Sequence, residues 1–190
     1  MNKPLLTCFL SALIAAPACA DDMSKYQDEA RAVTLPFLKQ LQAENQKAVA
    51  EGGPESAIGV CKDIAPKLAG EASRKNGIKL TRVSLKVRNP LLGTPDTWEQ
   101  RALHAFETRA ANGEKPETLE YSEIVKEPAG RYFRYVKAIA LQPGCVACHG
   151  SAEQIPDSVK AKLGEEYPHD RATGYAPGQI RGAVSIKRPL

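Results

Sequence analysis

The sequence predicts an α+β protein in which an antiparallel sheet carries helices on one side. Apolar residues recur every three or four positions over residues 23–51 and again over residues 54–72, as in amphipathic helices. Residues 119–125 and 131–141 alternate apolar and polar positions across a turn of hairpin length. A last alternating segment covers residues 180–187. Strands that follow one another through short turns pair antiparallel, and the helical segments then pack on the sheet.

The first 20 residues have the features of a secretory signal peptide. Lys3 supplies the positive charge, residues 5–16 form an apolar run, and Ala18-Cys19-Ala20 fits the small-x-small cleavage pattern. The apolar run is too short to cross a bilayer. Residues 1–20 therefore predict export to the periplasm and a mature chain that begins at Asp21.

The remaining residues, 21–190, predict a single domain, because they contain no linker, repeat or break in composition. A lipoprotein with an acylated Cys19 would carry a large aliphatic residue three positions earlier, where this chain has Ala16. No later segment has about 18 consecutive apolar residues, so stable membrane insertion is not expected. The net charge is +4 and the basic residues are dispersed, which gives no support for nucleic-acid binding.

Two long helices are predicted in the first half of the chain. The first covers residues 23–51; Pro36 predicts a kink in it, and Gly52-Gly53-Pro54 ends it. The second begins at Pro54 and contains Pro66, which removes one backbone hydrogen bond and bends the helix. The apolar stripe of the second helix consists of Ala57, Ile58, Cys61, Ala65, Leu68 and Ala72.

A strand is predicted over residues 78–88, after the turn Asn76-Gly77. One face of this strand is basic and is either solvated or paired with carboxylates, because guanidinium groups bind carboxylates well. The apolar face consists of Val83, Leu85 and Val87, and the basic face of Arg82, Ser84, Lys86 and Arg88.

A third helix is predicted over residues 97–111, capped by Thr94 or Asp96. His104 lies on it and is expected at the surface or in the core rather than at a metal. The two strands of the hairpin follow, and then a short helix over residues 157–163 precedes the last strand. The inward residues of the third helix are predicted to be Trp98, Ala102, Leu103 and Phe106.

The segment Gly144-Cys145-Val146-Ala147-Cys148-His149-Gly150 contains the attachment signature of a c-type haem. Two thiols three residues apart reach both vinyl groups of one porphyrin edge, and the next side chain places its imidazole under the iron. Cys145 and Cys148 would carry thioether bonds, and His149 would be an axial ligand. One covalently attached haem c is therefore predicted, and Arg82 and Arg88 are candidates to bind its propionate groups.

A zinc site, a redox-active thiol pair and a plain disulfide account for the Cys-x-x-Cys-His motif less well. A zinc site needs a second pair of ligands at similar spacing, but His104 and His169 are isolated. A thioredoxin-like pair opens the first helix of a βαβ unit near the N-terminus, whereas this motif lies three-quarters of the way along the chain.

Cys61 is the one cysteine that neither the signal peptide nor the haem motif accounts for. An unpaired thiol in an oxidising compartment is either buried or bound to a metal. Methionine, the usual sixth ligand of an electron-carrying cytochrome c, occurs in the mature chain only as Met23. The remaining candidates for the sixth position are His104, His169, Cys61, a lysine or open coordination.

In its motifs, the chain resembles a family of exported single-haem c-type proteins with a PAS-like fold, which occur as free proteins and as input domains of sensor kinases and chemoreceptors. The resemblance extends from about Tyr26 to Lys187. Its landmarks are Ala57 to Cys61, Ala65-Pro66, Arg82-Val83-Ser84, Arg88-Asn89-Pro90, Pro95-Asp96, Trp98-Glu99, Arg134-Tyr135, Cys145 to Gly150 and Arg181-Gly182-Ala183.

The resemblance implies a PAS-like antiparallel sheet with long N-terminal helices packed around one c-type haem. It also implies that Cys61 ligates the iron as a thiolate opposite His149, and that Tyr135 belongs with the cofactor-binding residues. The chain departs from the family pattern after Pro90, where Leu91-Leu92-Gly93-Thr94 replaces a spacer that contains asparagine.

The expected function is that of an exported haem-based sensor of redox state or of a diatomic gas. A low-potential periplasmic electron carrier is the alternative. An enzyme is not expected, because no acid/base constellation accompanies the haem motif. The chain carries no signalling segment of its own, so a separate redox or signalling partner is expected.

Overall fold

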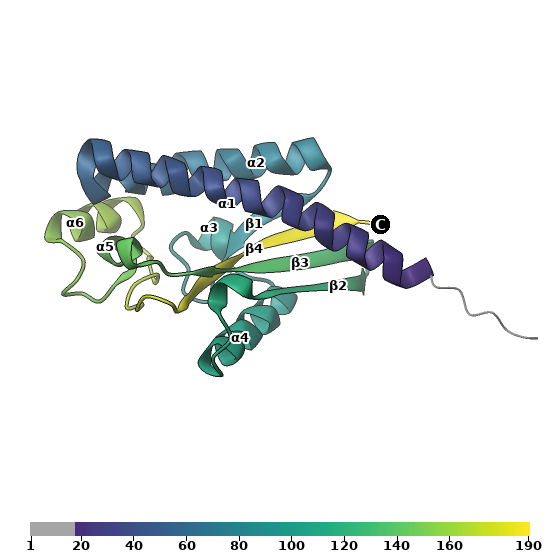
Figure 1. Ribbon diagram of the computed structural model, residues 1–190. Coiled ribbons are helices and arrows are strands. Elements are labelled where there is room, and N and C mark those ends of the chain that lie inside the picture. Colours follow the sequence, from purple (N-terminus) through teal and green to yellow (C-terminus); the bar gives the residue numbers. More distant parts are fainter. Residues whose placement is uncertain (1–17) are drawn as a thin grey trace, which may run out of the picture.

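A four-stranded antiparallel sheet lies between helices on both of its faces in the computed structural model, which describes residues 18–190 (Figure 1). The signal peptide predicted over residues 1–20 lies almost wholly outside these residues. The strands follow the order β1-β4-β3-β2 across the sheet, so the last strand of the chain lies in its interior. Their bounds are β1 Lys79–Val83, β2 Glu120–Glu127, β3 Gly130–Ala140 and β4 Ile180–Pro189.

The long helices form a hairpin that covers one face of the sheet (Figure 1). Helix α1 spans Ala18–Gly59, but Gly52 and Gly53 leave the helical conformation, and Gly53 has φ 77°. The chain reverses there and returns through α2, Ala65–Asn76. The predicted helix end at these glycines is confirmed, since a positive φ costs glycine little. At Pro36 the backbone dihedrals stay helical.

A π-helical turn, Val60–Ile64, joins α1 to α2. The amide of Ala65 donates to the carbonyl of Val60, five residues back. Pro66 follows in the first turn of α2, where its missing N–H is tolerated. The irregularity predicted beside Pro66 is therefore present, and its form is an extra residue inserted into the helix. Cys61 lies in this turn.

Helix α4, Thr97–Ala111, packs on the opposite face of the sheet. Asp96 caps it: the Asp96 side chain accepts from the Glu99 amide, and the Glu99 side chain accepts from the Asp96 amide. The four residues predicted to face inward are all buried: Trp98, Ala102, Leu103 and Phe106.

The expectation of helices on one side of the sheet is wrong, because β3 is buried on both faces. Phe133 and Tyr135 pack in the cluster beneath α1 and α2, whereas Val136 and Ala138 pack in the cluster beneath α4. Arg134 points to the α4 side and is 3% exposed. Two separate apolar cores thus fix the sheet between its helical layers.

The strand predicted over residues 78–88 is also wrong in its second half, because β1 ends at Val83. Ser84 turns the chain away: its hydroxyl is 2.9 Å from the carbonyl O of Lys86 and 2.8 Å from that of Arg181. A short helix α3, Pro90–Gly93, follows with Asn89 as its cap. As a result Arg88 is buried at the end of the sheet rather than displayed on a strand face.

The last third of the chain builds the end of the molecule beneath the hairpin turn (Figure 1). Two short helices lie there, α5 Val146–His149 and α6 Asp157–Glu166, and α6 is three residues longer than predicted. Single 3-10 turns precede β2 and α5, at Pro116–Thr118 and Pro143–Cys145. Within residues 18–190, no helix combines the length and the apolar character needed to span a bilayer.

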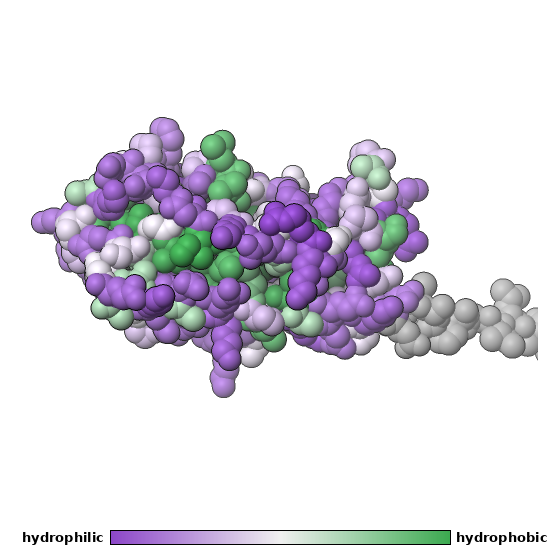
Figure 2. All heavy atoms as spheres, turned by 90° about the horizontal axis from the view of Figure 1, so that it is seen from above, coloured by the Kyte–Doolittle hydropathy of each residue, from purple (hydrophilic) through white to green (hydrophobic). Residues whose placement is uncertain are grey.

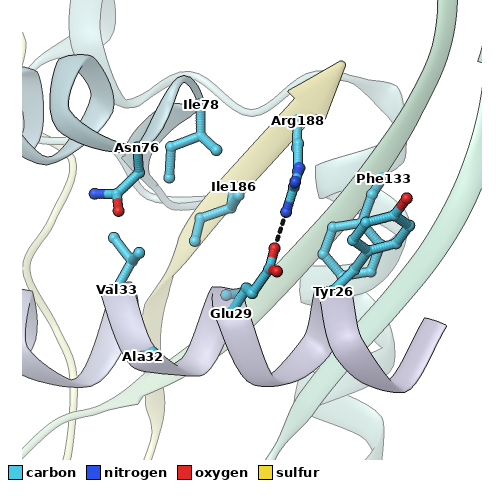
Figure 3. A pocket seen from close by; sticks show the side chains of 10 residues that line it. Tyr26, Glu29, Ala32, Val33, Asn76, Ile78, Phe133, Ile186 and Arg188 are labelled. Carbon is cyan, nitrogen blue, oxygen red and sulfur yellow. Dashed lines mark hydrogen bonds and ion pairs between the residues drawn. The ribbon is translucent and has the colours of Figure 1, made fainter. Parts of the chain in front are cut away.

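The other end of the molecule holds a cavity of about 290 Å³ between α1 and the sheet (Figure 3). An ion pair between Glu29 and Arg188 crosses it, and Tyr26 packs against Phe133 at its side. Figure 2, which looks down on the hairpin, shows apolar atoms gathered among mostly polar ones on its outer face. The cavity lining does not include the haem motif.

Gly182→Ala is expected to destabilise the fold by about 1–3 kcal/mol. A Cβ at Gly182 would overlap the carbonyl oxygen of Val83, which belongs to a neighbouring strand and cannot move freely. Chemical denaturation of the two proteins measures the difference. The matched control is Gly164→Ala in α6, where a Cβ meets nothing, so this variant should gain up to about 1 kcal/mol. Equal stability of Gly182→Ala and wild type would contradict the expectation.

Candidate haem site

The two motif cysteines lie on the short turn that leads into and through α5. Both are free thiols of intermediate exposure. Cys148 packs against an apolar cluster built from α1 and α6, which consists of Ile58, Ile155, Val159, Leu163 and Tyr167. Burial raises the pKa of the Cys148 thiol, and the neighbouring Cys61 and Cys145 thiols raise it further against the opposing charge of Arg88. The structure thus brings Cys61, Cys145 and Cys148 to one place.

His149 is held by one ring nitrogen. Its Nδ1 lies 2.7 Å from the carbonyl oxygen of Ala172, and this contact turns Nε2 away from the backbone. Burial lowers the pKa of His149 well below its ordinary value, and the positive charges of Arg181 and Arg88 act in the same direction. The lowered pKa favours the neutral imidazole, which is the form that ligates metals.

Arg88 fixes the haem motif to the loop that follows α6. Its Nε donates to Asp170 at 3.0 Å, and its Nη2 donates to the carbonyl of Cys148 at 2.5 Å. Asp170 in turn accepts from the amide of Ala172 at 2.7 Å. The same ion pair thus positions both His149 and the carbonyl to which His149 is bonded. With about one-tenth exposure on each partner, the pair is well shielded from water.

Two further arginines face His149 without an ion pair to any described residue. Arg181 approaches it directly, with Nε 3.2 Å from Nδ1. Arg82, from β1, contributes positive charge to the same group. Of the three guanidinium groups only that of Arg88 is paired with a carboxylate, Asp170, so the pocket is electropositive.

Cys61 reaches the site from the π-helical turn. Its Sγ lies 3.8 Å from Nδ2 of Asn45 on the other arm of the hairpin. π-helical turns inside α-helices frequently occur at functional sites, and this one places a thiol where both arms of the hairpin and α5 meet.

The structure separates the remaining candidates from this site. Tyr135, expected among the cofactor-binding residues, is buried beneath α1, and its hydroxyl donates to Glu120 at 2.7 Å. Its side chain packs in the core between α1 and the sheet. His104 is exposed on α4 beside Glu107, and His169 is exposed in the loop after α6.

The chemistry of these donors fits a haem. Two thiols and a neutral imidazole stand beside one another, a third thiol approaches from another element, and the arginines supply charge of the sign that propionates need. Apolar side chains of α1 and α6 supply a wall. Arg181 was not among the predicted ligand-binding residues, although the motif Arg181-Gly182-Ala183 contained it.

Comparison with known proteins identifies the family of the chain. No curated protein matches it. Among solved structures, the crystal structure of the cyanobacterial heme-protein Tll0287 matches with 26% identity and a TM-score of 0.63, over 93% of this chain and 98% of that one. The PAS-like α+β fold is confirmed by this match, and so is the family resemblance drawn from the motifs. A family model described as Tll0287-like matches residues 16–189, and the chain therefore belongs to the Tll0287-like family.

Proposed function

We propose that the protein is an exported single-haem c-type cytochrome that senses redox state or a diatomic gas. Cys145 and Cys148 would hold the haem through thioether bonds, with His149 and Cys61 as axial ligands. The observation that carries the proposal is the position of His149, whose Nδ1 contacts the Ala172 carbonyl and which adjoins two free thiols. The related solved structure is titled a heme-protein, which supports the same cofactor here.

The haem would supply a ferric/ferrous couple and, in the ferrous state, an affinity for small gases. A thiolate from Cys61 adds negative charge at the metal and favours the ferric state, within the roughly 0.8 V range that axial ligands command. Asn45 moderates this by donating to the same sulfur.

The position of Cys61 supports a sensing role. It lies in the π-helical turn that joins the two arms of the hairpin, and an insertion of this kind interrupts the regular hydrogen-bond ladder. A change in the bonding of Cys61 would therefore alter the positions of both α1 and α2. A separate signalling partner would bind the hairpin and respond to its position.

The rigid hold on His149 supports the alternative, a low-potential electron carrier. The buried pair of Arg88 and Asp170 fixes the motif and the carbonyl partner of His149 together. A ligand held this firmly does not rearrange on electron transfer. An electron carrier requires that Cys61 also stays bound to the iron. A rapidly reversible redox couple, with the same axial ligands in both oxidation states, would favour the electron carrier.

Changing Cys61 to serine is expected to abolish the low-spin thiolate signals in the absorption and low-temperature EPR spectra of the ferric protein. The serine hydroxyl keeps the shape of the side chain but is a far weaker donor. The haem itself should stay attached, since His149 and the thioether cysteines are untouched.

Ferrous carbon monoxide binding gives a second readout. Cys61→Ser should bind it faster than wild type, because the thiolate no longer competes for the site. His104→Ala, which removes an exposed histidine on α4, is the matched control and should leave both spectra unchanged. Identical spectra for wild type and Cys61→Ser would exclude Cys61 as a ligand and remove the basis of the sensing proposal.

A further inference from the structure

His149 Nδ1 has two neighbours that make incompatible demands. The carbonyl of Ala172, at 2.7 Å, can only accept a hydrogen bond, whereas Nε of Arg181, at 3.2 Å, can only donate one. A neutral imidazole nitrogen either carries a proton or offers a lone pair, so it satisfies one neighbour at a time. Which neighbour it satisfies depends on what the other ring nitrogen does.

Metal ligation resolves the conflict in one direction. If Nε2 gives its lone pair to a metal, the proton of the neutral ring is on Nδ1, and the hydrogen bond goes to the Ala172 carbonyl. Arg181 then loses its acceptor at His149. Its Nε becomes an unpaired donor beside the ligand.

The rest of the Arg181 side chain is already fixed. Nη1 donates to the Ser84 hydroxyl at 2.8 Å and lies 3.3 Å from the Lys86 carbonyl, and the guanidinium lies over the Tyr175 ring. Nη2 is not engaged by any residue of the described chain. Nε and Nη2 form one side of the planar guanidinium fork, and this side matches the two oxygens of a carboxylate.

The charges around Arg181 also call for an anion. Burial lowers the pKa of Arg181, and so do the positive charges of Arg88 and Arg82, against the opposing effects of Tyr175 and Asp170. The nearby carboxylate of Asp170 is paired with Arg88. Arg88 also donates a hydrogen bond to the Cys148 carbonyl. Arg88 is thus occupied as a clamp, which leaves Arg181 and Arg82 to balance an incoming negative charge.

We propose that Arg181, assisted by Arg82, binds a propionate carboxylate of the haem whose iron His149 ligates, so that Arg181 exchanges the imidazole for the propionate when the haem is in place. This inference rests on the proposed haem attachment, but it does not depend on Cys61 as a ligand. The sequence named Arg82 and Arg88 as candidates for the propionates; this inference keeps Arg82 and replaces Arg88 by Arg181.

The test uses the purified holoprotein with Arg181→Leu, Arg181→Lys and the control Arg171→Leu, which removes an exposed arginine from the adjoining loop. Two quantities are measured: the midpoint reduction potential and the propionate bending band in the resonance Raman spectrum. Arg181→Leu should lower the potential, because an unbalanced propionate favours ferric iron, and should shift the propionate band. Arg181→Lys should restore part of both effects, and Arg171→Leu should leave the propionate band in place.

Two results would overturn the assignment. An unchanged propionate band in Arg181→Leu excludes the contact, whatever happens to the potential. If added acetate shifts the potential of wild type but not that of Arg181→Leu, with the propionate band unmoved in both, then Arg181 binds a free anion instead.

A second variant tests the same contact in case Arg181→Leu does not fold. Arg82→Leu should shift the same band in the same direction by a smaller amount, and no shift would again count against the propionate. The thiolate EPR signal of Cys61 should persist in all of these variants. Failure of the propionate inference is therefore distinguishable from failure of the ligation proposal, which Cys61→Ser tests.

Discussion

Replacing both Cys145 and Cys148 by serine is expected to abolish all haem that survives denaturation of the protein. The two thiols are the groups that would form thioether bonds, and serine hydroxyls form none. The measurement is haem staining of a denaturing gel, after expression in a host with cytochrome c maturation. Each single variant should retain some bound haem, with a pyridine haemochrome spectrum altered by the loss of one thioether.

Cys61→Ser is the matched control for this experiment. It makes the same chemical change in the same region, since the Cys61 and Cys148 thiols lie close enough to influence one another electrostatically. It should keep the full haem stain while its spectrum changes. Full staining of the double variant would show that attachment does not use the motif cysteines.

The elements that the sequence predicted well are those whose signals are local. The capping box of Asp96 and Glu99 starts α4 at the predicted residue. The turn at Pro128-Ala129 joins β2 to β3, and Glu127 pairs with Gly130 as in a tight hairpin. In both cases residues within four positions of one another determine the geometry.

The sequence predictions are wrong where a residue far away in the sequence determines the local structure. Alternation continues from Val83 to Arg88, but the Ser84 hydroxyl contacts the carbonyl of Arg181 from β4, which lies 97 positions away. That contact turns the chain, and no local pattern contains it. The charge of Arg134 alone predicts a solvent-facing residue of β3, and only α4 makes its burial possible.

The site could be predicted in part for the same reason. Cys145, Cys148 and His149 form one contiguous motif, so they are recognisable from sequence. Cys61 and Arg181 lie 84 residues before and 36 residues after Cys145. Cys61 was one of several candidates until the family resemblance singled it out, and Arg181 was not predicted. Tyr135 shows the converse, since a landmark residue of the family here serves the core.

Arg134→Met is expected to destabilise the fold by about 3–5 kcal/mol, because it leaves a buried carboxylate without its cation. Arg134 is 3% exposed and Glu99 is 7% exposed. Nη2 of Arg134 lies 2.7 Å from Asp96 and 3.4 Å from Glu99, and its guanidinium lies 4.5 Å from the centre of the Trp98 ring. One side chain therefore fastens the start of α4 to β3. Chemical denaturation measures the loss.

Arg109→Met makes the same substitution in an exposed ion pair with Glu114 and should change stability by no more than about 0.5 kcal/mol. The comparison separates burial from charge, since both variants lose one cation. It also assigns a role to the family landmarks Trp98-Glu99 and Arg134. If they are structural, the folded fraction of Arg134→Met keeps the haem spectrum of wild type. Loss of the wild-type spectrum at unchanged stability would instead place Arg134 at the cofactor.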